Sequence, residues 1–136
     1  MLPTELFLSH SCEDHIFVAP LVELLRRHGI PVWYSPTNIL GAQQWHDEIG
    51  AALKRCDWFC IVLSPQAVAS TWVKRETLYA LNDRRYDNRI VPLLYQPCAH
   101  DDFSWTLGSL QFVDFSQSIE NSYRQLLRTW GLGYQP

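Results

Sequence analysis

An unbroken apolar run occupies residues 58–63, which read Trp58-Phe59-Cys60-Ile61-Val62-Leu63, and it stops at Ser64-Pro65. A strand with one face in water alternates apolar and polar residues, whereas a strand covered on both faces has no need to alternate. The run therefore predicts a central strand of a parallel sheet.

Further short strands are predicted on both sides of this run. They occupy residues 5–9, 30–34, 89–95 and 111–114. Pro92 lacks the N–H that a strand interior donates to its neighbour. We therefore expect the strand over residues 89–95 to lie near the edge of the sheet or to be bulged at Pro92.

Helical periodicity fills the intervals between these strands. The first helix ends at His28-Gly29 with Gly29 as its C-cap, and Pro20 predicts a kink or a late start within it. Ser70 is the expected N-cap of a helix over residues 71–84. Apolar stripes mark the first helix (Phe17, Leu21, Leu24, Leu25), a helix after residue 44 (Trp45, Ile49, Ala52, Leu53) and a closing helix over 119–130 (Tyr123, Leu126, Leu127, Trp130).

Strands that alternate with helices along the whole chain predict an α/β fold built from βαβ units. We expect a flavodoxin-like three-layer sandwich, in which a five-stranded parallel sheet of order 2-1-3-4-5 has helices on both faces, and a single domain over residues 1–136. In such a fold, functional residues lie at the carboxyl ends of the strands. The loops at 9–14, 35–44 and 64–72 are therefore expected around one crevice.

Composition excludes several classes of function. The 136 residues carry a net charge of −3 and no run of Lys or Arg, which argues against nucleic acid or a membrane as a partner. The first five residues do not resemble a signal peptide, so a cytoplasmic protein with reduced cysteines is expected. A metal site on one loop was considered and set aside, because it would crowd soft and hard ligands together: His10, Cys12, Asp14 and His15.

Glu76 is the most informative single residue of the predicted helix over 71–84. On a helical projection it lies where a core stripe (Val73, Thr77, Ala80, Leu81) meets an aromatic and acidic stripe (Trp72, Tyr79, Asp83). No Lys or Arg stands three or four residues away to pair with it. From the residues alone, Glu76 is either a solvated surface carboxylate or a functional one.

Several motifs resemble the boxes of bacterial TIR (Toll/interleukin-1 receptor) domains, in the same order along the chain. Residues 7–14, Phe-Leu-Ser-His-Ser-Cys-Glu-Asp, resemble the first box, and 29–34, Gly-Ile-Pro-Val-Trp-Tyr, resemble the second strand of that family. Residues 60–65 followed by 70–76, Ser-Thr-Trp-Val-Lys-Arg-Glu, are similar to the third strand and the W-x-x-x-E helix of the NAD⁺-cleaving members. Residues 90–93 match the fourth strand.

This resemblance implies that Glu76 is the catalytic residue and that NAD⁺ is the substrate, with no further cofactor. Cleavage of the nicotinamide–ribose bond releases a neutral pyridine, so the leaving group needs no general acid. A fixed carboxylate can hydrogen-bond the ribose hydroxyls and stabilise the oxocarbenium-like transition state. Attack of water on the ribosyl cation then gives ADP-ribose, whereas attack by the adenine of the substrate gives an isomer of cyclic ADP-ribose. The resemblance also implies a role in bacterial immune signalling against phage.

By position, the resemblance assigns substrate contacts to His10, Ser11, Trp33, Ser35 and Trp72. Two of these residues depart from the family pattern. Many NAD⁺-cleaving members carry an acid where this chain has Ser35, and others carry a basic residue where it has Ser11. Each of the five also has an ordinary structural interpretation, such as a capping serine or a core aromatic residue.

The family resemblance further implies self-association through the BB loop, with contacts from Pro36, Thr37, Asn38, Ile39, Gly41 and Trp45. The alternative within the family is a non-enzymatic module for TIR–TIR interaction, which needs no Trp72–Glu76 pair. A phosphoacceptor receiver of the same fold would need an aspartate where Ser64 stands. A flavin site would need a neutral phosphate loop where the acidic Glu13-Asp14 stands.

Overall fold

The computed structural model describes residues 2–34 and 42–136, except for the side chains of 42–45. It contains a five-stranded parallel sheet in the order β2-β1-β3-β4-β5, which confirms the predicted fold class. The strands are β1 (Leu6–Ser9), β2 (Val32–Tyr34), β3 (Trp58–Leu63), β4 (Ile90–Leu94) and β5 (Val113–Asp114).

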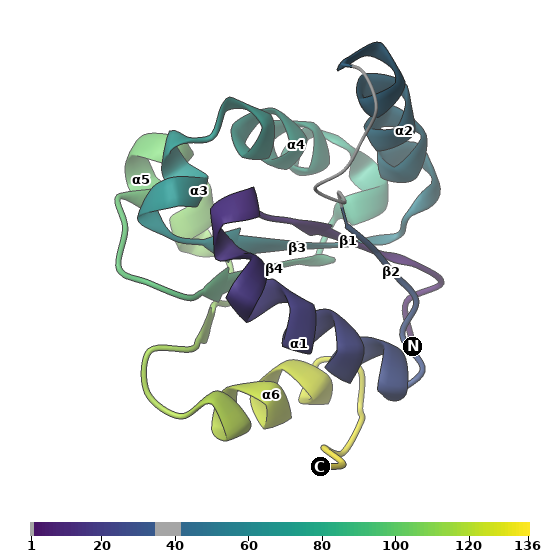
Figure 1. The fold of residues 1–136 in the computed structure, drawn as a ribbon, viewed down its shortest axis with the longest axis vertical. Coiled ribbons are helices and arrows are strands. Elements are labelled where there is room, and N and C mark those ends of the chain that lie inside the picture. Colours follow the sequence, from purple (N-terminus) through teal and green to yellow (C-terminus); the bar gives the residue numbers. More distant parts are fainter. Residues whose placement is uncertain (1, 35–41) are drawn as a thin grey trace.

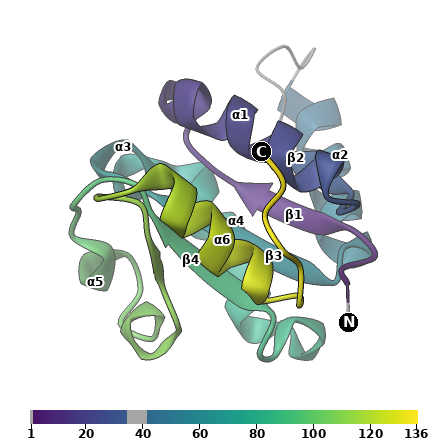
Figure 2. The ribbon, with the colours of Figure 1, turned by 90° about the horizontal axis from the view of Figure 1, so that it is seen from below.

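Helices cover both faces of this sheet. On one face lie α1 (His15–Arg27) and α6 (Ile119–Arg128), and on the other lie α2 (Ala42–Arg55), α3 (Pro65–Ala69) and α4 (Thr71–Asn82) (Figure 1). The short α5 (His100–Phe103) lies on the β4 side of the molecule (Figure 2), where it contacts α3 and adds Phe103 to the core of the same face. Single 3-10 turns occur at η1 (Cys12–Asp14), η2 (Arg84–Tyr86) and η3 (Leu107–Ser109).

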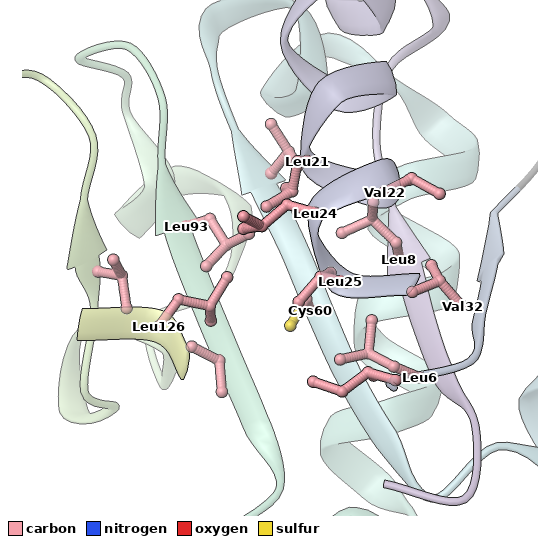
Figure 3. Close-up of a cluster of buried hydrophobic side chains, with 14 of the residues drawn as sticks. Leu6, Leu8, Leu21, Val22, Leu24, Leu25, Val32, Cys60, Leu93 and Leu126 are labelled. Atoms are coloured by element: carbon pink, nitrogen blue, oxygen red, sulfur yellow. The ribbon is translucent and has the colours of Figure 1, made fainter. Parts of the chain in front are cut away.

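The two faces have separate apolar cores because successive strand side chains point to opposite sides. Leu6 and Leu8 of β1 belong to the core under α1 and α6, where they pack with residues such as Leu25 and Leu126 (Figure 3). Phe7, between them, belongs to the core under α2, α3 and α4. β3 divides its side chains in the same way, which explains why all of its residues are apolar.

Pro20 lies inside α1, so the late start that its position suggested is wrong. The helix begins at His15, and Pro20 lies on its exposed side. Proline removes the hydrogen bond to the carbonyl of Ile16, a residue that is itself 76% exposed. The buried stripe of α1 outweighs the loss because it stays continuous past Pro20.

Pro92 lies in β4, one strand in from the edge of the sheet, as expected from its missing donor. β5 pairs only with Leu93 and Leu94, which lie beyond Pro92. The two-residue β5 is shorter than the strand predicted over residues 111–114. β4 likewise occupies 90–94 within the predicted 89–95.

Both ends of the chain are held at the amino-terminal edge of the strands. The backbone N–H and hydroxyl of Thr4 donate to the carboxylate of Asp57, just before β3. The N–H of Gln135 donates to Nε2 of His28 over 2.9 Å, at the last turn of α1. Along the described residues, no helix has the length and apolarity that crossing a bilayer requires.

Candidate functional site

Glu76 lies in the second turn of α4 and is only 6% exposed, so the interpretation as a solvated surface carboxylate is wrong. Ser70 sets the start of this helix, because its hydroxyl accepts a hydrogen bond from the N–H of Val73, as predicted. α4 packs across β1 and β3. This packing brings Glu76 to the carboxyl end of β1, where the hydroxyl of Ser9 donates a 2.7 Å hydrogen bond to its Oε1.

Burial raises the pKa of Glu76 from its usual 4.5 to about 7, and the hydrogen bond from Ser9 partly opposes this rise. Within residues 2–34 and 42–136, no lysine, arginine or histidine forms an ion pair with it. A buried carboxyl without a cation is costly to ionise. Carboxyl groups with a pKa raised in this way are found preferentially in binding and catalytic sites.

Trp72 stands one turn before Glu76 and is half-buried against the core of that face. The guanidinium of Arg75 lies over its ring at 5.4 Å, and the ring of His46 meets it edge-on at 6.1 Å. His46 belongs to the first turns of α2. The indole therefore bridges α4 and the start of α2, beside the carboxylate.

Trp33 lies on the same face of the sheet as Trp72. Its ring stacks on Phe7 of the neighbouring strand at 4.9 Å, and it is half-buried. The strand register places Phe7 directly opposite Trp33. Trp33 is thus a core aromatic residue with a partly exposed side, an arrangement compatible with packing and with ligand contact.

His10 follows β1 directly but turns toward the ring of Tyr34, with the ring centroids 5.8 Å apart. Tyr34 packs against the core under α1, on the face opposite Trp33. Burial lowers the pKa of His10, so its ring is neutral at pH 7. Its Nδ1 is buried and has no hydrogen-bond partner among the described residues.

The hydroxyl of Ser11 is used locally. It accepts a 3.3 Å hydrogen bond from the N–H of Glu13 and caps η1, and the residue is buried. Its assignment as a substrate contact stays a prediction. Three residues on, Asp14 is also buried and accepts a hydrogen bond from Ser64 at the end of β3.

Other predicted site residues lie outside the described part of the chain. They are Ser35, assigned to the substrate, and the BB-loop residues Pro36, Thr37, Asn38, Ile39 and Gly41. Trp45 falls within α2, but its side chain is not described. These assignments stay predictions. Among the described residues, no three or more His, Cys, Asp or Glu side chains are arranged to hold a metal ion.

Sequence reasoning missed two groups that the fold brings to this edge. Ser9 was placed at the end of the first strand and the start of the loop at 9–14, but its role as the partner of Glu76 was not predicted. Asp14 and Ser64 were discussed in relation to a metal, flavin or phosphoacceptor site, but the hydrogen bond by which they join two loops was not predicted. Ser9 could have been found from strand alternation, because it follows Phe7 by two residues and so faces α4.

The comparisons with known proteins agree with this geometry. The family model described as TIR domain matches residues 6–127. A 2′ cyclic ADP-D-ribose synthase of Acinetobacter baumannii is 30% identical over 128 residues, which are 90% of this chain and 47% of that protein. The NAD(+) hydrolase TcpC of Escherichia coli is 29% identical over 89 residues, which are 64% of this chain and 29% of that protein.

This chain thus spans about half, or less, of the length of the curated relatives that it matches. Among solved structures, the TIR domain of the Toll-related receptor TRR-2 from Hydra magnipapillata superposes with a TM-score of 0.74 at 21% identity. The match covers 90% of this chain and 94% of that one. At this identity it supports the fold alone.

Proposed function

We propose, from the premise that this chain belongs to the TIR domain family, that it cleaves the bond between nicotinamide and ribose in NAD⁺, with Glu76 as the catalytic carboxylate. The observation that carries the proposal is a buried carboxyl that forms no ion pair with any described residue and is held by a hydroxyl at the carboxyl end of a parallel strand. Relatives named as an NAD(+) hydrolase and a cyclic ADP-ribose synthase support the substrate.

The chemistry suits a single carboxylate. When the glycosidic C–N bond breaks, its electron pair stays with the nicotinamide nitrogen, which becomes neutral and needs no proton. The positive charge moves to the ribose ring, where an ionised Glu76 accepts hydrogen bonds from the hydroxyls and stabilises the cation. Low polarity around Glu76 strengthens this attraction relative to water.

The proposed substrate contacts come from the strands and helices near the carboxyl end of the sheet, where Glu76 lies. Trp72 flanks the ribose on the α4 side, and Trp33 offers its exposed side to an aromatic ring of the substrate. His10, which directly follows β1, is proposed to contact a polar group of the ligand. Ser11 and Ser35 complete the proposed set. The reaction requires no metal or further cofactor.

The fate of the ribosyl cation decides the product. Attack by water, with loss of a proton to solvent, gives ADP-ribose. Attack by a nucleophile from the rest of the same molecule, also with loss of a proton to solvent, gives an isomer of cyclic ADP-ribose. Both outcomes have a precedent in the names of the relatives. Mass spectrometry of the products distinguishes them, because ADP-ribose is heavier than the cyclic product by one water molecule.

The proposed setting is the bacterial cytoplasm, where the enzyme responds to phage by consuming NAD⁺ or releasing a signal. We further propose that copies associate through the BB loop, with Pro36, Thr37, Asn38, Ile39, Gly41 and Trp45 at the contact. In this arrangement a neighbouring subunit completes the crevice, so activity depends on assembly. Phage plaque counts on bacteria that express the wild type or Glu76→Ala test the setting.

Nicotinamide release from NAD⁺, followed by chromatography at high protein concentration, tests the proposal. Wild type is expected to release nicotinamide, with or without EDTA, and Glu76→Ala is expected to lose at least about 100-fold of this rate. Glu23→Ala, which removes an exposed glutamate of α1, is the matched control and should keep full activity. Equal rates in Glu76→Ala and wild type contradict the enzyme and favour the non-enzymatic interaction module.

A further inference from the structure

Ser9 stands out among the polar side chains of the fold. Among the described residues, two hydrogen bonds join buried side chains to each other, Ser9 to Glu76 and Ser64 to Asp14. Both lie at the carboxyl ends of β1 and β3. Ser9 is 1% exposed, so its hydroxyl is sequestered from water. This hydroxyl donates a hydrogen bond to Glu76.

We propose that Ser9 is a positioning residue for Glu76, holding one carboxylate oxygen so that the other is presented to the ribose of the substrate. This inference rests on the proposed function for its catalytic meaning. The contact itself stands on geometry, because the hydroxyl oxygen lies 2.7 Å from Oε1 of Glu76. Sixty-seven residues of chain separate the two groups.

The backbone around Ser9 fixes the direction of its hydroxyl. Ser9 pairs with Ile61 in the register of β1 and β3, so it belongs to the ordered sheet and not to the loop. Phe7, two residues earlier, packs in the core under α4. Because side chains alternate along a strand, Ser9 also faces α4, where its hydroxyl reaches Glu76. A glutamate held at one oxygen loses the free rotation of its carboxyl group.

The same bond favours the charged form of Glu76. Burial raises the pKa of this carboxyl, whereas the hydrogen bond from Ser9 lowers it. The surrounding elements carry other titratable or charged groups: His10 and Asp14 after β1, His46 on α2, and Lys74 and Arg75 on α4. None of these described groups forms an ion pair with Glu76. Loss of the Ser9 hydroxyl should therefore raise the pKa of Glu76 further.

The kinetic test compares Ser9→Ala with Ser9→Thr, which keeps the hydroxyl. In Ser9→Ala, kcat should fall by about tenfold with KM changed by less than about twofold, and the acidic limb of kcat/KM should move up by about half to one pH unit. Ser9→Thr should restore both properties. Thr77→Val is the control, because it removes a buried hydroxyl of the same helix that bonds the carbonyl of Val73.

A second measurement does not depend on activity. Titration of the ¹³C-labelled carboxyl of Glu76 by NMR should give a higher midpoint in Ser9→Ala than in wild type, Ser9→Thr and Thr77→Val. If wild type fails to cleave NAD⁺, the proposed function falls, and this titration still decides the link between Ser9 and Glu76. If Ser9→Ala does not fold, Ser9→Cys fills the same space with a weaker donor and should shift the midpoint in the same direction. Equal midpoints in wild type and in Ser9→Ala, or in Ser9→Cys if Ser9→Ala does not fold, overturn the proposal. A kcat of Ser9→Thr as low as that of Ser9→Ala overturns it as well.

Discussion

The hydroxyl of Ser64 donates a 2.5 Å hydrogen bond to Oδ2 of Asp14, and both side chains are at most 3% exposed. Ser64 directly follows β3 and Asp14 belongs to the turn after β1, so the bond ties together the segments that follow these two neighbouring strands. The same hydroxyl accepts a hydrogen bond from the N–H of Ala67 and caps α3. Ser64 therefore both caps the start of α3 and holds the turn after β1 in place.

Ser64→Ala is expected to lower the free energy of unfolding by about 2–3 kcal/mol, because it leaves the buried carboxyl of Asp14 unpaired and uncaps α3. Urea denaturation monitored by circular dichroism measures the change. Glu13→Ala, at an exposed neighbour of Asp14, is the control and should change stability by less than about 0.5 kcal/mol. A similarly small effect for Ser64→Ala contradicts the role of this bond.

Glu76→Gln should stabilise the fold at pH 8 by roughly 1–3 kcal/mol. Because burial raises the pKa of Glu76 from 4.5 to about 7, the folded state holds this proton more tightly than the unfolded chain does. The resulting stability is fully present below pH 4.5 and is lost as pH rises through about 7. Glutamine carries no such penalty, so the gain should vanish near pH 5.

Thermal unfolding of wild type and Glu76→Gln across pH 5–8 measures this difference. Glu23→Gln serves as the control, because its side chain is exposed and should give equal stability at every pH. A constant gap between Glu76→Gln and wild type over the whole range contradicts the raised pKa.

The rate of NAD⁺ cleavage should rise with pH as Glu76 ionises. The acidic limb of kcat/KM is expected near pH 7, because this parameter reports the free enzyme. In the complex, the positive nicotinamide ring favours the carboxylate, so the limb of kcat should lie at lower pH. Initial rates at saturating and low NAD⁺ separate the two. A kcat/KM that does not change between about pH 5.5 and 8.5 would rule out Glu76 as the ionising group.

Specific activity should rise with protein concentration if a neighbouring subunit completes the crevice. Over about a hundredfold range of concentration, nicotinamide release per molecule should increase together with the assembled fraction measured by light scattering. Trp45→Ala should weaken both properties. Trp105→Ala removes an 86% exposed indole far along the chain and serves as its control. Specific activity that stays constant over the range argues against assembly.

Local sequence signals predicted most of the fold. β3 matched residues 58–63 because an apolar run covered on both faces leaves no choice of face or register. α4 began where Ser70 supplied a cap. It ended two residues earlier than predicted, because Asp83 adopts an extended backbone and caps the next turn by accepting from the N–H of Arg85. The end of a helix depends on this local competition more than on periodicity.

The partners within the site required tertiary structure. Helical projection placed Glu76 at the border of the core stripe, but only the packing of α4 across β1 shows that it is buried and which hydroxyl it meets. The short turns α5 and η3 were not predicted, because neither spans enough residues to show a period. The start of α1 relative to Pro20 was predicted wrongly, because the stability that a helix gains from burying one face depends on the residues that pack against it.

The anchoring of the chain ends offers a practical route to controlled activation. Thr4 is tied near the start of β3 and Gln135 is tied to the last turn of α1, whereas Glu76 lies at the opposite edge of the sheet. A tether attached at either end is therefore separated from the carboxylate by the length of the strands. Chemically induced dimerisers fused at these points would bring copies together on demand without obstructing the edge of the sheet at which Glu76 lies.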